Sequence, residues 1–315
     1  MRVEKPVLVL VGPTAVGKTA LSLQIAERYD AEIVSVDSMQ IYRYMDIGTA
    51  KPTLAERGGI PHHLIDIVTP ETPYDAAAFA RDGLQAIDAI HERGRLPLLA
   101  GGTGLYLRAL LEGLFEAPPI PDEVRQHLRE RLEKNGVSGL YQELAQVDPP
   151  SAKRIAHTDR QRIVRALEVY HATGISWSRH LELHQEKGAG LRFANVLHIG
   201  LTCDRHLLYQ RIDERCAAML EAGLEEEVRS LLARGYHRQL KPMGAIGYRH
   251  MLDYLDGHCD EQTMLELMRR DTRHYAKRQY TWFTRDEKVE WCAVNDTKNI
   301  LARINCWQKE SLETP

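Results

Sequence analysis

Residues 12–19 read Gly-Pro-Thr-Ala-Val-Gly-Lys-Thr, a phosphate-binding loop pattern in which two glycines enclose four residues and Lys-Thr follows. The apolar run 6–11 precedes the loop and is typical of a parallel strand buried on both faces. After the loop, Leu21 and Ile25 recur at helical spacing while Gln24 falls on the other side. This order of strand, loop and helix predicts an α/β fold built on a parallel sheet, and a chance glycine-rich turn is the competing interpretation.

The loop is a candidate site for a diphosphate or triphosphate. Its backbone N–H groups converge on an anion at the positive end of the helix dipole. The Lys18 ammonium can reach outer phosphate oxygens, and the Thr19 hydroxyl can ligate Mg²⁺. The residues expected to hold the phosphates are Gly12, Pro13, Thr14, Ala15, Val16, Gly17, Lys18 and Thr19. The pattern does not indicate what happens to the phosphate.

Composition describes a globular chain with room for a large core and a second lobe. Of its 315 residues, 43% are apolar and 27% are charged, and the formal net charge is −3. Five cysteines without a Cys-x-x-Cys pair argue against a disulfide framework or a zinc site and indicate reduced thiols. No apolar run is long enough to span a bilayer, and no signal peptide is evident. We therefore expect a cytoplasmic protein without a membrane partner, and a monomer by default.

The second predicted strand, residues 32–36, ends on Asp37, which Ser38, Met39 and Gln40 follow. The carboxyl ends of strands in an open parallel sheet form its ligand-binding edge, so Asp37 is a candidate functional carboxylate. Two roles compete for Asp37: a magnesium ligand, as in nucleotide hydrolases, and a general base acting on an incoming substrate. A solvated loop carboxylate is the third interpretation.

A second glycine-rich turn, residues 101–104, follows the predicted strand 96–100 and precedes a predicted helix that begins near residue 105. It would lie at the same sheet edge, where glycines let a bulky substrate approach the backbone and the Thr103 hydroxyl can donate a hydrogen bond. A plain strand-to-helix turn explains it equally well. Residues 64–67 are predicted as a further short strand and residues 74–92 as a helix.

A proline cluster at residues 118–121 marks a change of character, because residues 116–190 are helical and polar in pattern. Strand character returns at residues 196–201, so this block is predicted to be inserted into one α/β domain. The expected organisation is a P-loop NTPase-like core in residues 1–115, the helical insertion in 116–190, and the remainder of the core with C-terminal helices in 191–315. The last third is predicted to be helical.

Two basic stretches stand out on this net-acidic chain. Residues 151–172 carry a net charge of +3, and residues 269–285 carry +5 with Tyr275, Tyr280, Trp282 and Phe283 interleaved. Basic side chains suit backbone phosphates and aromatic rings suit unstacked bases, a combination typical of a surface that binds single-stranded or loop RNA. The alternative is a pair of solvated helix faces whose aromatic residues belong to the core.

Taken together, the motifs resemble those of the bacterial tRNA dimethylallyltransferase family, and the resemblance runs through nearly the whole chain. The segments that carry it are 12–19, 37–40, 46–52, 101–106, Arg162 with 165–168, 244–248, 275–279 and 281–283. Their joint occurrence in this order is highly specific. Two departures are Val16, where the family usually has Ser, and Tyr44, where Gly is usual. Val16 has little effect because the loop acts through its backbone, whereas Tyr44 leaves the turn geometry open.

The resemblance implies transfer of a dimethylallyl group from dimethylallyl diphosphate to the exocyclic N6 amine of the adenosine 3′-adjacent to the anticodon in tRNA. It implies Mg²⁺ as cofactor and assigns catalytic roles to Asp37 as base, to Thr103 near the reacting centre and to Lys18 at the leaving diphosphate. The positions implied to contact the tRNA anticodon stem-loop are Asp37, Ser38, Met39, Gln40, Thr103, Arg125, Gln161, Arg162, Ile163, Val164, Arg165, Gly244, Gly247, Tyr275, Lys277, Arg278, Gln279 and Trp282.

Three other functions share parts of this pattern. An isopentenyltransferase acting on free adenine nucleotide has the same core, but a small substrate needs no basic inserted lobe. A P-loop small-molecule kinase would consume the γ-phosphate of ATP. An RNA-binding protein with a vestigial loop would not need Lys18, Thr19 and Asp37, which this chain retains.

Overall fold

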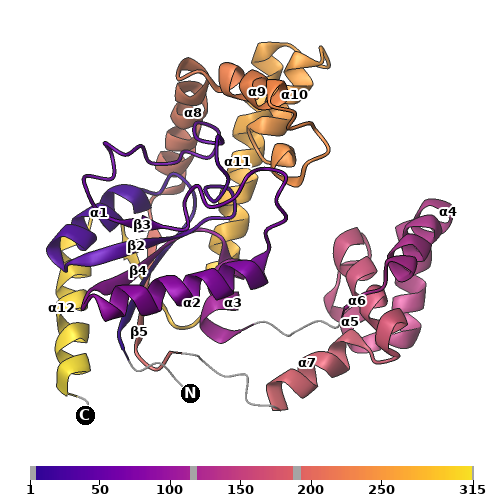
Figure 1. The fold of residues 1–315 in the computed structure, drawn as a ribbon, viewed down its shortest axis with the longest axis horizontal. Helices are drawn as coiled ribbons and strands as arrows, with labels where there is room; N and C mark the ends of the chain where they lie inside the picture. The colour runs from indigo at the N-terminus through magenta and orange to yellow at the C-terminus, as the bar shows by residue number, and fades with distance from the viewer. Residues whose placement is uncertain (1–4, 114–118, 187–192, 314–315) are drawn as a thin grey trace. The chain divides into compact units, whose positions relative to one another are not determined.

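The computed structural model describes residues 5–113, 119–186 and 193–313. It divides into two compact units (Figure 1). Unit 1 combines Met1–Leu111 with Arg192–Pro315, and unit 2 is Glu112–Leu191. Unit 2 is thus inserted in the sequence of unit 1. Within the described ranges, no helix is both long enough and apolar enough to cross a lipid bilayer.

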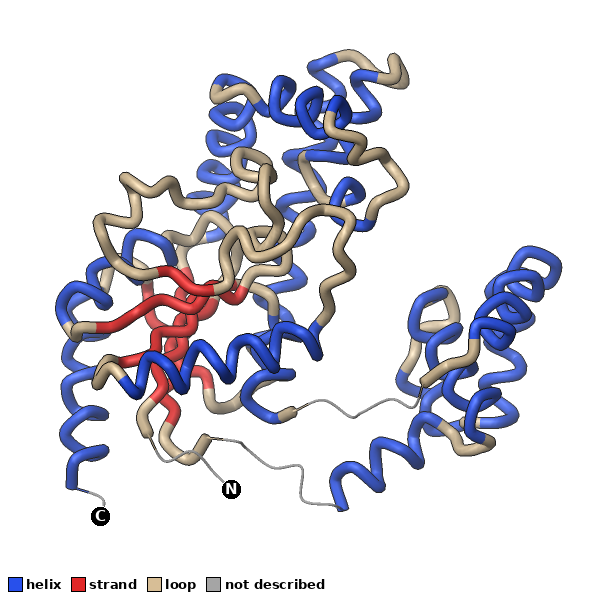
Figure 2. Tube along the Cα trace, in the orientation of Figure 1, coloured by secondary structure: helices blue, strands red, loops and turns tan. Residues whose placement is uncertain are grey.

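Unit 1 contains one six-stranded sheet whose pairings are all parallel (Figure 2). Its order is β3-β2-β4-β1-β5-β6. The strands are β1 (Val7–Val11), β2 (Ala31–Val36), β3 (His62–His63), β4 (Leu96–Gly101), β5 (Val196–Thr202) and β6 (Val289–Ala293). The predicted parallel α/β sheet is confirmed, and β1, which carries the loop, lies between β4 and β5.

Helices pack on both faces of the sheet (Figure 1). Leu8 and Leu10 of β1 join a buried cluster with residues of α1 (Lys18–Arg28) and α12 (Thr297–Glu313). Val9 alternates with them and points to the opposite face, where α2 (Ala76–Glu92) contacts β2 and β4. The Phe79 ring of α2 stacks on Tyr106 of α3 (Gly104–Glu112) at 4.6 Å between centroids. Burial on both faces explains the uninterrupted apolar run of β1.

The remaining helices of unit 1 follow β5 in sequence. They are α8 (Arg205–Glu221), α9 (Leu224–Ala233), the short 3₁₀ turn η1 (Lys241–Gly244), α10 (Tyr248–Leu255) and α11 (Glu261–Phe283). Asp204 begins α8 by accepting hydrogen bonds from the N–H groups of His206 and Leu207, and Asp260 accepts one from Thr263 at the start of α11. Helix α11 packs along α8 and α10, and its C-terminal half reaches the sheet edge that carries the loop.

Unit 2 is helical, and its helices are α4 (Asp122–Val147), α5 (Pro149–Arg154), α6 (Arg160–Thr173) and α7 (Trp177–Glu186). Helix α4 is interrupted at Gly136, whose φ of 64° is a left-handed conformation that glycine adopts without strain. Its two parts pack around fully buried leucines, including Leu128 and Leu144, together with Leu167 of α6. The insertion therefore has an apolar core of its own.

Two local predictions are wrong. Residues 64–67 are not a strand, because Leu64 and Asp66 have φ values of 61° and 58°, which no β-strand accommodates. The strand in this region is β3, two residues earlier. The last third also contains β6, a parallel edge strand in a stretch predicted to be entirely helical. Of its apolar side chains only Val289 is buried, and the exposed Glu290 follows it, so no continuous hydrophobic run marks the strand.

Tyr44, the departure from the family pattern, has a φ of 69°, which explains why glycine is usual there. Its exposed ring stacks on Tyr236 at 6.3 Å between centroids, and the Arg234 guanidinium lies 4.4 Å from its centroid. These contacts offset the cost of the left-handed backbone.

Candidate active site

The sheet register brings three sequence motifs to one edge. Val11 and Val36 are both paired in register with Gly101, so the segments that follow β1, β2 and β4 leave the sheet at the same level. These segments contain the phosphate-binding loop, Asp37 and Thr103. Their convergence results from the parallel topology, in which all carboxyl ends share one edge.

The loop is shaped by left-handed residues. Gly12 and Gly17 have φ values of 150° and 112°, and a Cβ at Gly12 would lie 2.8 Å from the Leu201 carbonyl oxygen. Gly17 begins α1 without a side-chain cap, so the first N–H groups of the helix face the loop interior. These features explain both glycines of the motif and provide an anion site.

Lys18 lies at the centre of this loop. Its ammonium donates hydrogen bonds to the carbonyl oxygens of Gly12 at 2.9 Å and Pro13 at 2.7 Å. Burial, together with the nearby Arg215 guanidinium, lowers the pKa of Lys18 to about 7, although Asp37 acts in the opposite direction. An anionic ligand in the loop would reverse this shift by stabilising the charged ammonium.

Asp37 follows β2 and folds back onto its own backbone. Its Oδ1 accepts hydrogen bonds from the N–H groups of Met39 at 2.8 Å and Gln40 at 3.3 Å. Within the described part of the chain, Oδ2 has no hydrogen-bond partner and is available to a ligand. Burial raises the pKa of Asp37, with the two N–H groups and Lys18 opposing it. A held carboxylate with one open oxygen and a raised pKa is suited to accept a proton.

Thr103 lies across from Asp37 on the second glycine-rich turn. Its Oγ1 accepts a hydrogen bond from the Ser38 N–H at 3.1 Å, which fixes the hydroxyl beside Asp37. Tyr275 of α11 lines the same cavity as Asp37 and Ser38, and its burial near Asp37 raises the pKa of the phenol above its ordinary value. The predicted residues Asp37, Ser38, Thr103 and Tyr275 therefore lie together at this edge.

Gln279 connects the two glycine-rich turns. Its side-chain Oε1 accepts a hydrogen bond from the Thr14 N–H at 2.8 Å, and its Nε2 donates to the Gly102 carbonyl at 3.0 Å. A Cβ at Gly102 would lie 2.0 Å from that Nε2. Gln279 is buried, and both ends of its side-chain amide bind the protein backbone, while its contact with RNA stays a prediction.

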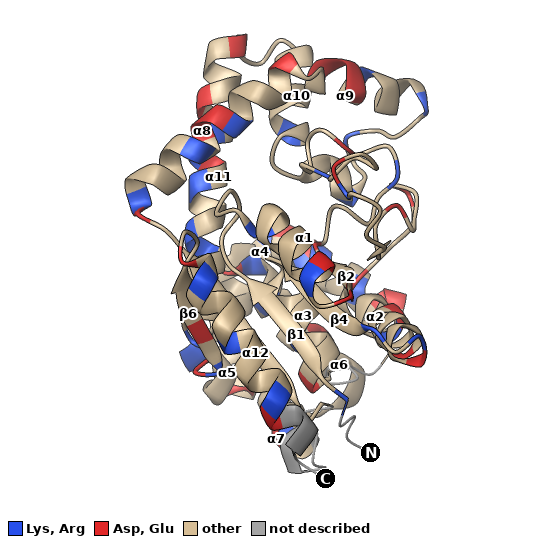
Figure 3. Ribbon diagram, turned by 90° about the vertical axis from the view of Figure 1, so that its left-hand side faces the viewer, with Lys and Arg blue, Asp and Glu red and all other residues tan. Residues whose placement is uncertain are grey.

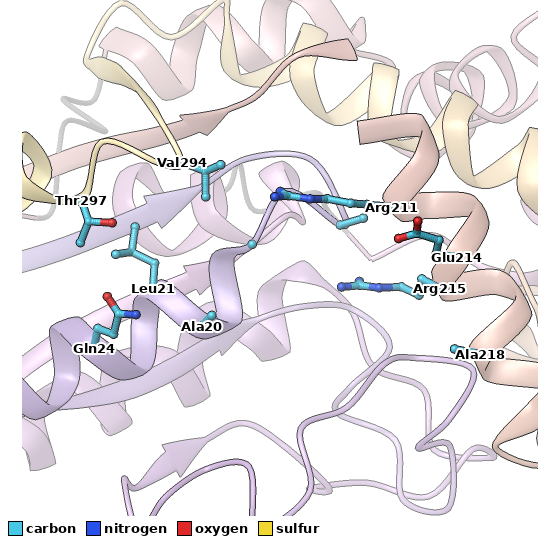
Figure 4. A pocket seen from close by; sticks show the side chains of 11 residues that line it. Ala20, Leu21, Gln24, Arg211, Glu214, Arg215, Ala218, Val294 and Thr297 are labelled. Carbon is cyan, nitrogen blue, oxygen red and sulfur yellow. The ribbon is translucent and has the colours of Figure 1, made fainter. Parts of the chain in front are cut away.

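Two arginines of α8 reach the loop and were not singled out from the sequence. Arg211 donates to the Val16 carbonyl at 3.2 Å, and Arg215 to the Thr14 hydroxyl at 3.5 Å. Both side chains extend from α8 across a cavity of about 540 Å³ beside the start of α1 (Figure 4). Their i, i+4 spacing beside the buried Ile212 and Cys216 is the one local signal that they share a face.

Two further cavities meet at Asp37. The phosphate cavity, about 280 Å³, is lined by Asp37 and Gln40 and by residues of the loop and the start of α1, namely Thr14, Ala15, Gly17, Lys18, Thr19 and Ala20. The apolar cavity, about 330 Å³, is lined by Asp37 and by Met39, Met219, Ile246 and Met268 among others. Arg215, Thr49 and Ala50 line both. The site therefore pairs an anion-binding end with an apolar end, and the carboxylate stands between them.

The predicted RNA-contact positions on α11 differ in exposure. Lys277 and Arg278 are exposed, and Trp282 is 38% exposed while its indole covers Gly104, where a Cβ would lie 2.1 Å from Nε1. Figure 3 marks Lys and Arg positions in blue along the ribbons of α8 and α11. Gly244 lines the apolar cavity, and Gly247, with a φ of 91°, begins α10. The structure thus places Gly244 in the cavity wall and Gly247 at the start of α10, and their contact with RNA stays a prediction.

The predicted RNA-contact positions of unit 2 lie on α4 and α6. Arg125, Arg162 and Arg165 each form a local ion pair, with Asp122, Asp159 and Glu168 respectively. Gln161 is exposed, whereas Val164 packs against the apolar core. The Ile163 side chain is fully buried in that core, so the predicted RNA contact at this position would use its backbone.

The fold and the site define a P-loop α/β protein whose glycine-rich loop is shaped to hold a phosphorylated ligand beside a partly buried carboxylate. Comparison with known proteins narrows this class. A model of the IPP transferase family matches residues 40–286, and an isopentenyl transferase model matches residues 5–67. A tRNA dimethylallyltransferase of Desulfotalea psychrophila is 51% identical, covering 99% of this chain and 98% of the relative.

Solved structures indicate the same family as the sequence relatives. The full-length tRNA isopentenylpyrophosphate transferase of Bacillus halodurans superposes with a TM-score of 0.73 at 38% identity, covering 98% of this chain and 99% of that one. A eukaryotic dimethylallyltransferase acting on tRNA gives a TM-score of 0.83 at 29% identity, covering 98% of this chain and 80% of that one. The chain belongs to the tRNA dimethylallyltransferase family.

Proposed function

We propose that the protein transfers the dimethylallyl group of dimethylallyl diphosphate to the N6 amine of the adenosine 3′-adjacent to the anticodon in tRNA, releasing diphosphate. The observation that carries the proposal is the position of Asp37 between an anion-binding cavity and an apolar one. Such a pair fits a donor with a charged head and a five-carbon tail.

The diphosphate end of the donor binds in the loop. Breaking the allylic carbon–oxygen bond leaves negative charge on the diphosphate, and groups aimed at that charge stabilise the transition state more than the ground state. The N–H groups at the start of α1, the Lys18 ammonium and the Arg215 guanidinium are positioned for this role. Lys18 gives up its hydrogen bonds to Gly12 and Pro13 in exchange for phosphate oxygens.

Mg²⁺ fits the donor set of the phosphate cavity. The Thr19 hydroxyl lines it, and a hydroxyl oxygen is a ligand that Mg²⁺ accepts. Within the described residues, no cluster of three or more acidic, His or Cys side chains forms a metal site, so diphosphate and water would supply the other ligands. The ion would neutralise charge on the diphosphate, with Thr19 as its ligand from the loop.

Asp37 acts as the general base. The exocyclic amine of adenine is a weak nucleophile that loses a proton as its nitrogen bonds to the allylic carbon, while the carbon–oxygen bond to the diphosphate breaks. Oδ2 of Asp37 accepts that proton, and Oδ1 stays anchored to Met39 and Gln40. Thr103, fixed by Ser38, stands beside the carboxylate to position the amine.

The acceptor is a base in an anticodon loop, which must leave its stack to enter the site. Exposed basic side chains on α6 and α11, with Trp282, suit the phosphates and bases of such a loop. Ser38, Met39 and Gln40 line or border the cavities where the base would arrive. We propose as well that the protein acts in the cytoplasm and as a monomer.

Label transfer from dimethylallyl diphosphate tests the proposal. The protein is incubated with Mg²⁺, labelled donor and unmodified tRNA carrying an A-A-A run in its anticodon loop, with AMP and ATP in parallel reactions. Label on the tRNA adenine, none on AMP and no ATP turnover is the expected result. Label on AMP alone would identify a nucleotide acceptor, and ATP turnover would identify a kinase. Bound tRNA without transfer would indicate an RNA-binding protein.

A further inference from the structure

The segment 46–50, which forms part of the site wall, is held by one carboxylate from a distant helix. Oε2 of Glu227 on α9 accepts hydrogen bonds from the N–H groups of Asp46 at 2.9 Å and Ile47 at 2.7 Å. Its Oε1 accepts from the Gly48 N–H at 3.1 Å and from the Tyr248 hydroxyl at 2.7 Å. Four donors thus converge on one side chain, which leaves it no freedom to reorient.

Glu227 touches neither cavity, but the segment it holds touches both. Gly48 lines the apolar cavity, and Thr49 and Ala50 line both cavities. Residues 46–50 belong to no helix or strand, so no regular backbone ladder fixes their N–H groups. Three consecutive N–H groups that point the same way form a concave anion-binding backbone, and Glu227 fills it from outside the site.

Tyr248 adds a steric contact to the hydrogen bonds that Glu227 makes. We call Glu227 and Tyr248, with the 46–48 backbone that they hold, the Glu227 clamp. Its side chain is fully buried, and its ring lies so close to Gly48 that a Cβ there would meet Cε2 at 2.6 Å. Burial and the neighbouring Glu227 raise the pKa of Tyr248, so its hydroxyl stays a donor. Gly48 has no positive φ, and the ring contact therefore explains the glycine.

Other hydrogen bonds hold the residues on either side of the 46–50 segment. The hydrogen bonds of Glu227 are the ones that tie this segment to α9. The buried Lys51 ammonium donates to the Tyr42 carbonyl at 2.7 Å and to carboxylate oxygens of Asp46 at 2.6 Å and Asp66 at 2.5 Å. Gln40 donates to the Thr49 carbonyl at 3.4 Å. These partners all lie within residues 40–66, whereas Glu227 comes from a helix beyond the insertion.

We propose that Glu227 is a positioning residue for the donor: it holds residues 46–48 so that the 46–50 wall encloses the dimethylallyl group. The inference rests on the proposed function, because it assigns the apolar cavity to the prenyl tail. It does not place Glu227 at the reacting atoms. The carboxylate acts on the donor indirectly, through the backbone of Asp46, Ile47 and Gly48, with the Tyr248 hydroxyl supporting its position.

Glu227→Gln is the sharpest variant because it keeps the shape of the side chain. An amide has a single acceptor oxygen, so its NH₂ group must face either the Gly48 N–H or the N–H pair of Asp46 and Ile47. Glu226→Gln, on the exposed face of the same helix turn, is the matched control. Tyr248→Phe removes one donor of the four and should show the same effect more weakly.

Two ligands distinguish an effect on the 46–50 wall from an effect on the phosphate-binding loop, because only one of them carries a prenyl tail. We expect Glu227→Gln to weaken binding of the unreactive dimethylallyl S-thiodiphosphate at least tenfold by calorimetry, while inorganic diphosphate stays within threefold of wild type. In turnover the KM for dimethylallyl diphosphate should rise tenfold with kcat within threefold. Equal weakening of both ligands, unchanged binding of the analogue, or the same loss in Glu226→Gln would overturn the inference.

Hydrogen exchange tests the clamp without any substrate. In the free protein, Glu227→Gln should speed amide exchange in a peptide covering residues 42–52 at least tenfold and leave peptides of β1 and β4 unchanged. Unchanged exchange in residues 42–52 would refute the clamp even if transfer activity is present. Failure of the wild type to transfer label, with exchange altered as expected, would instead refute the proposed function and retain the clamp.

Discussion

Raising the pH from 7.5 to 8.5 should weaken binding of dimethylallyl diphosphate because Lys18, already mostly neutral in the free protein at pH 7.5, must take up a proton when the diphosphate binds. Its pKa is lowered to about 7, mainly by burial, and a bound diphosphate restores the charged form. Each pH unit above a pKa of about 7 then costs roughly tenfold in affinity, or about 1.4 kcal/mol. Over this interval the expected loss is about eightfold, and the terminal phosphate, with a pKa of about 6, is already ionised throughout.

Calorimetry measures this effect in two independent ways. At pH 8, titration with dimethylallyl S-thiodiphosphate in buffers of different ionisation enthalpy should show uptake of about 0.9 proton per ligand bound, the neutral fraction of a group with a pKa of about 7. Lys18→Met binds more weakly but has nothing to titrate, so its affinity should not change with pH. Affinity that stays constant from pH 7.5 to 8.5 in the wild type, with no proton uptake, would refute the reasoning.

Three more predictions concern the carboxylates and the sheet edge. Asp37→Asn keeps an Oδ1 acceptor for the Met39 N–H but is not basic, so single-turnover transfer should fall about 10²- to 10⁴-fold while tRNA affinity in a filter-binding assay stays within a few fold; loss of tRNA binding with intact transfer contradicts the assignment. Glu32, buried and hydrogen-bonded above all by Arg93, has a pKa lowered to about 2, so it contributes about 3 kcal/mol that is present above pH 4.5 and is lost as the pH falls toward 2. Urea unfolding at pH 6 should show Glu32→Gln less stable by about this amount, and a flat comparison between pH 6 and 3.5 in the wild type contradicts it. Gly101→Ala would place a Cβ 2.1 Å from the Val36 carbonyl oxygen, a backbone atom that cannot move aside, and should lower the free energy of unfolding by about 3 kcal/mol or more in the same assay, whereas a neutral effect would show that the strand pair can shift.

The sheet could be predicted wherever its strands are buried on both faces. The residues of β1 are all buried, and such a run has few other interpretations. By contrast, β6 lies at the sheet edge and only its Val289 is buried. Its sequence therefore lacks the apolar run that would distinguish a strand from the residues around a helix end. The error at Leu64 and Asp66 has another cause: their left-handed backbone serves the ion pair between Asp66 and Lys51, which is a tertiary contact.

The placement of Asp37 and Thr103 could be predicted for the same topological reason, because each directly follows a parallel strand. Arg215 and Gln279 could not be placed, since each reaches the loop from a helix far along the chain. Helix α11 carries several polar side chains in its C-terminal half, and only the packing of α11 decides that Gln279 turns inward. The sequence pattern therefore predicts residues fixed by the sheet better than residues fixed by helix docking.

The long-range pairing of β1 also sets when the site can form during synthesis. Leu8 pairs in register with Leu98 and with Leu197, and the Thr14 N–H finds its partner 265 residues later, at Gln279. At roughly 5 to 20 residues per second, a ribosome needs about 13 to 50 s to add that last partner. Until then the nascent phosphate-binding loop lacks its hydrogen bond to Gln279, and the apolar strand β1 lacks part of its packing. A stalled or truncated chain that ends before α11 would carry the motif without its bridging glutamine.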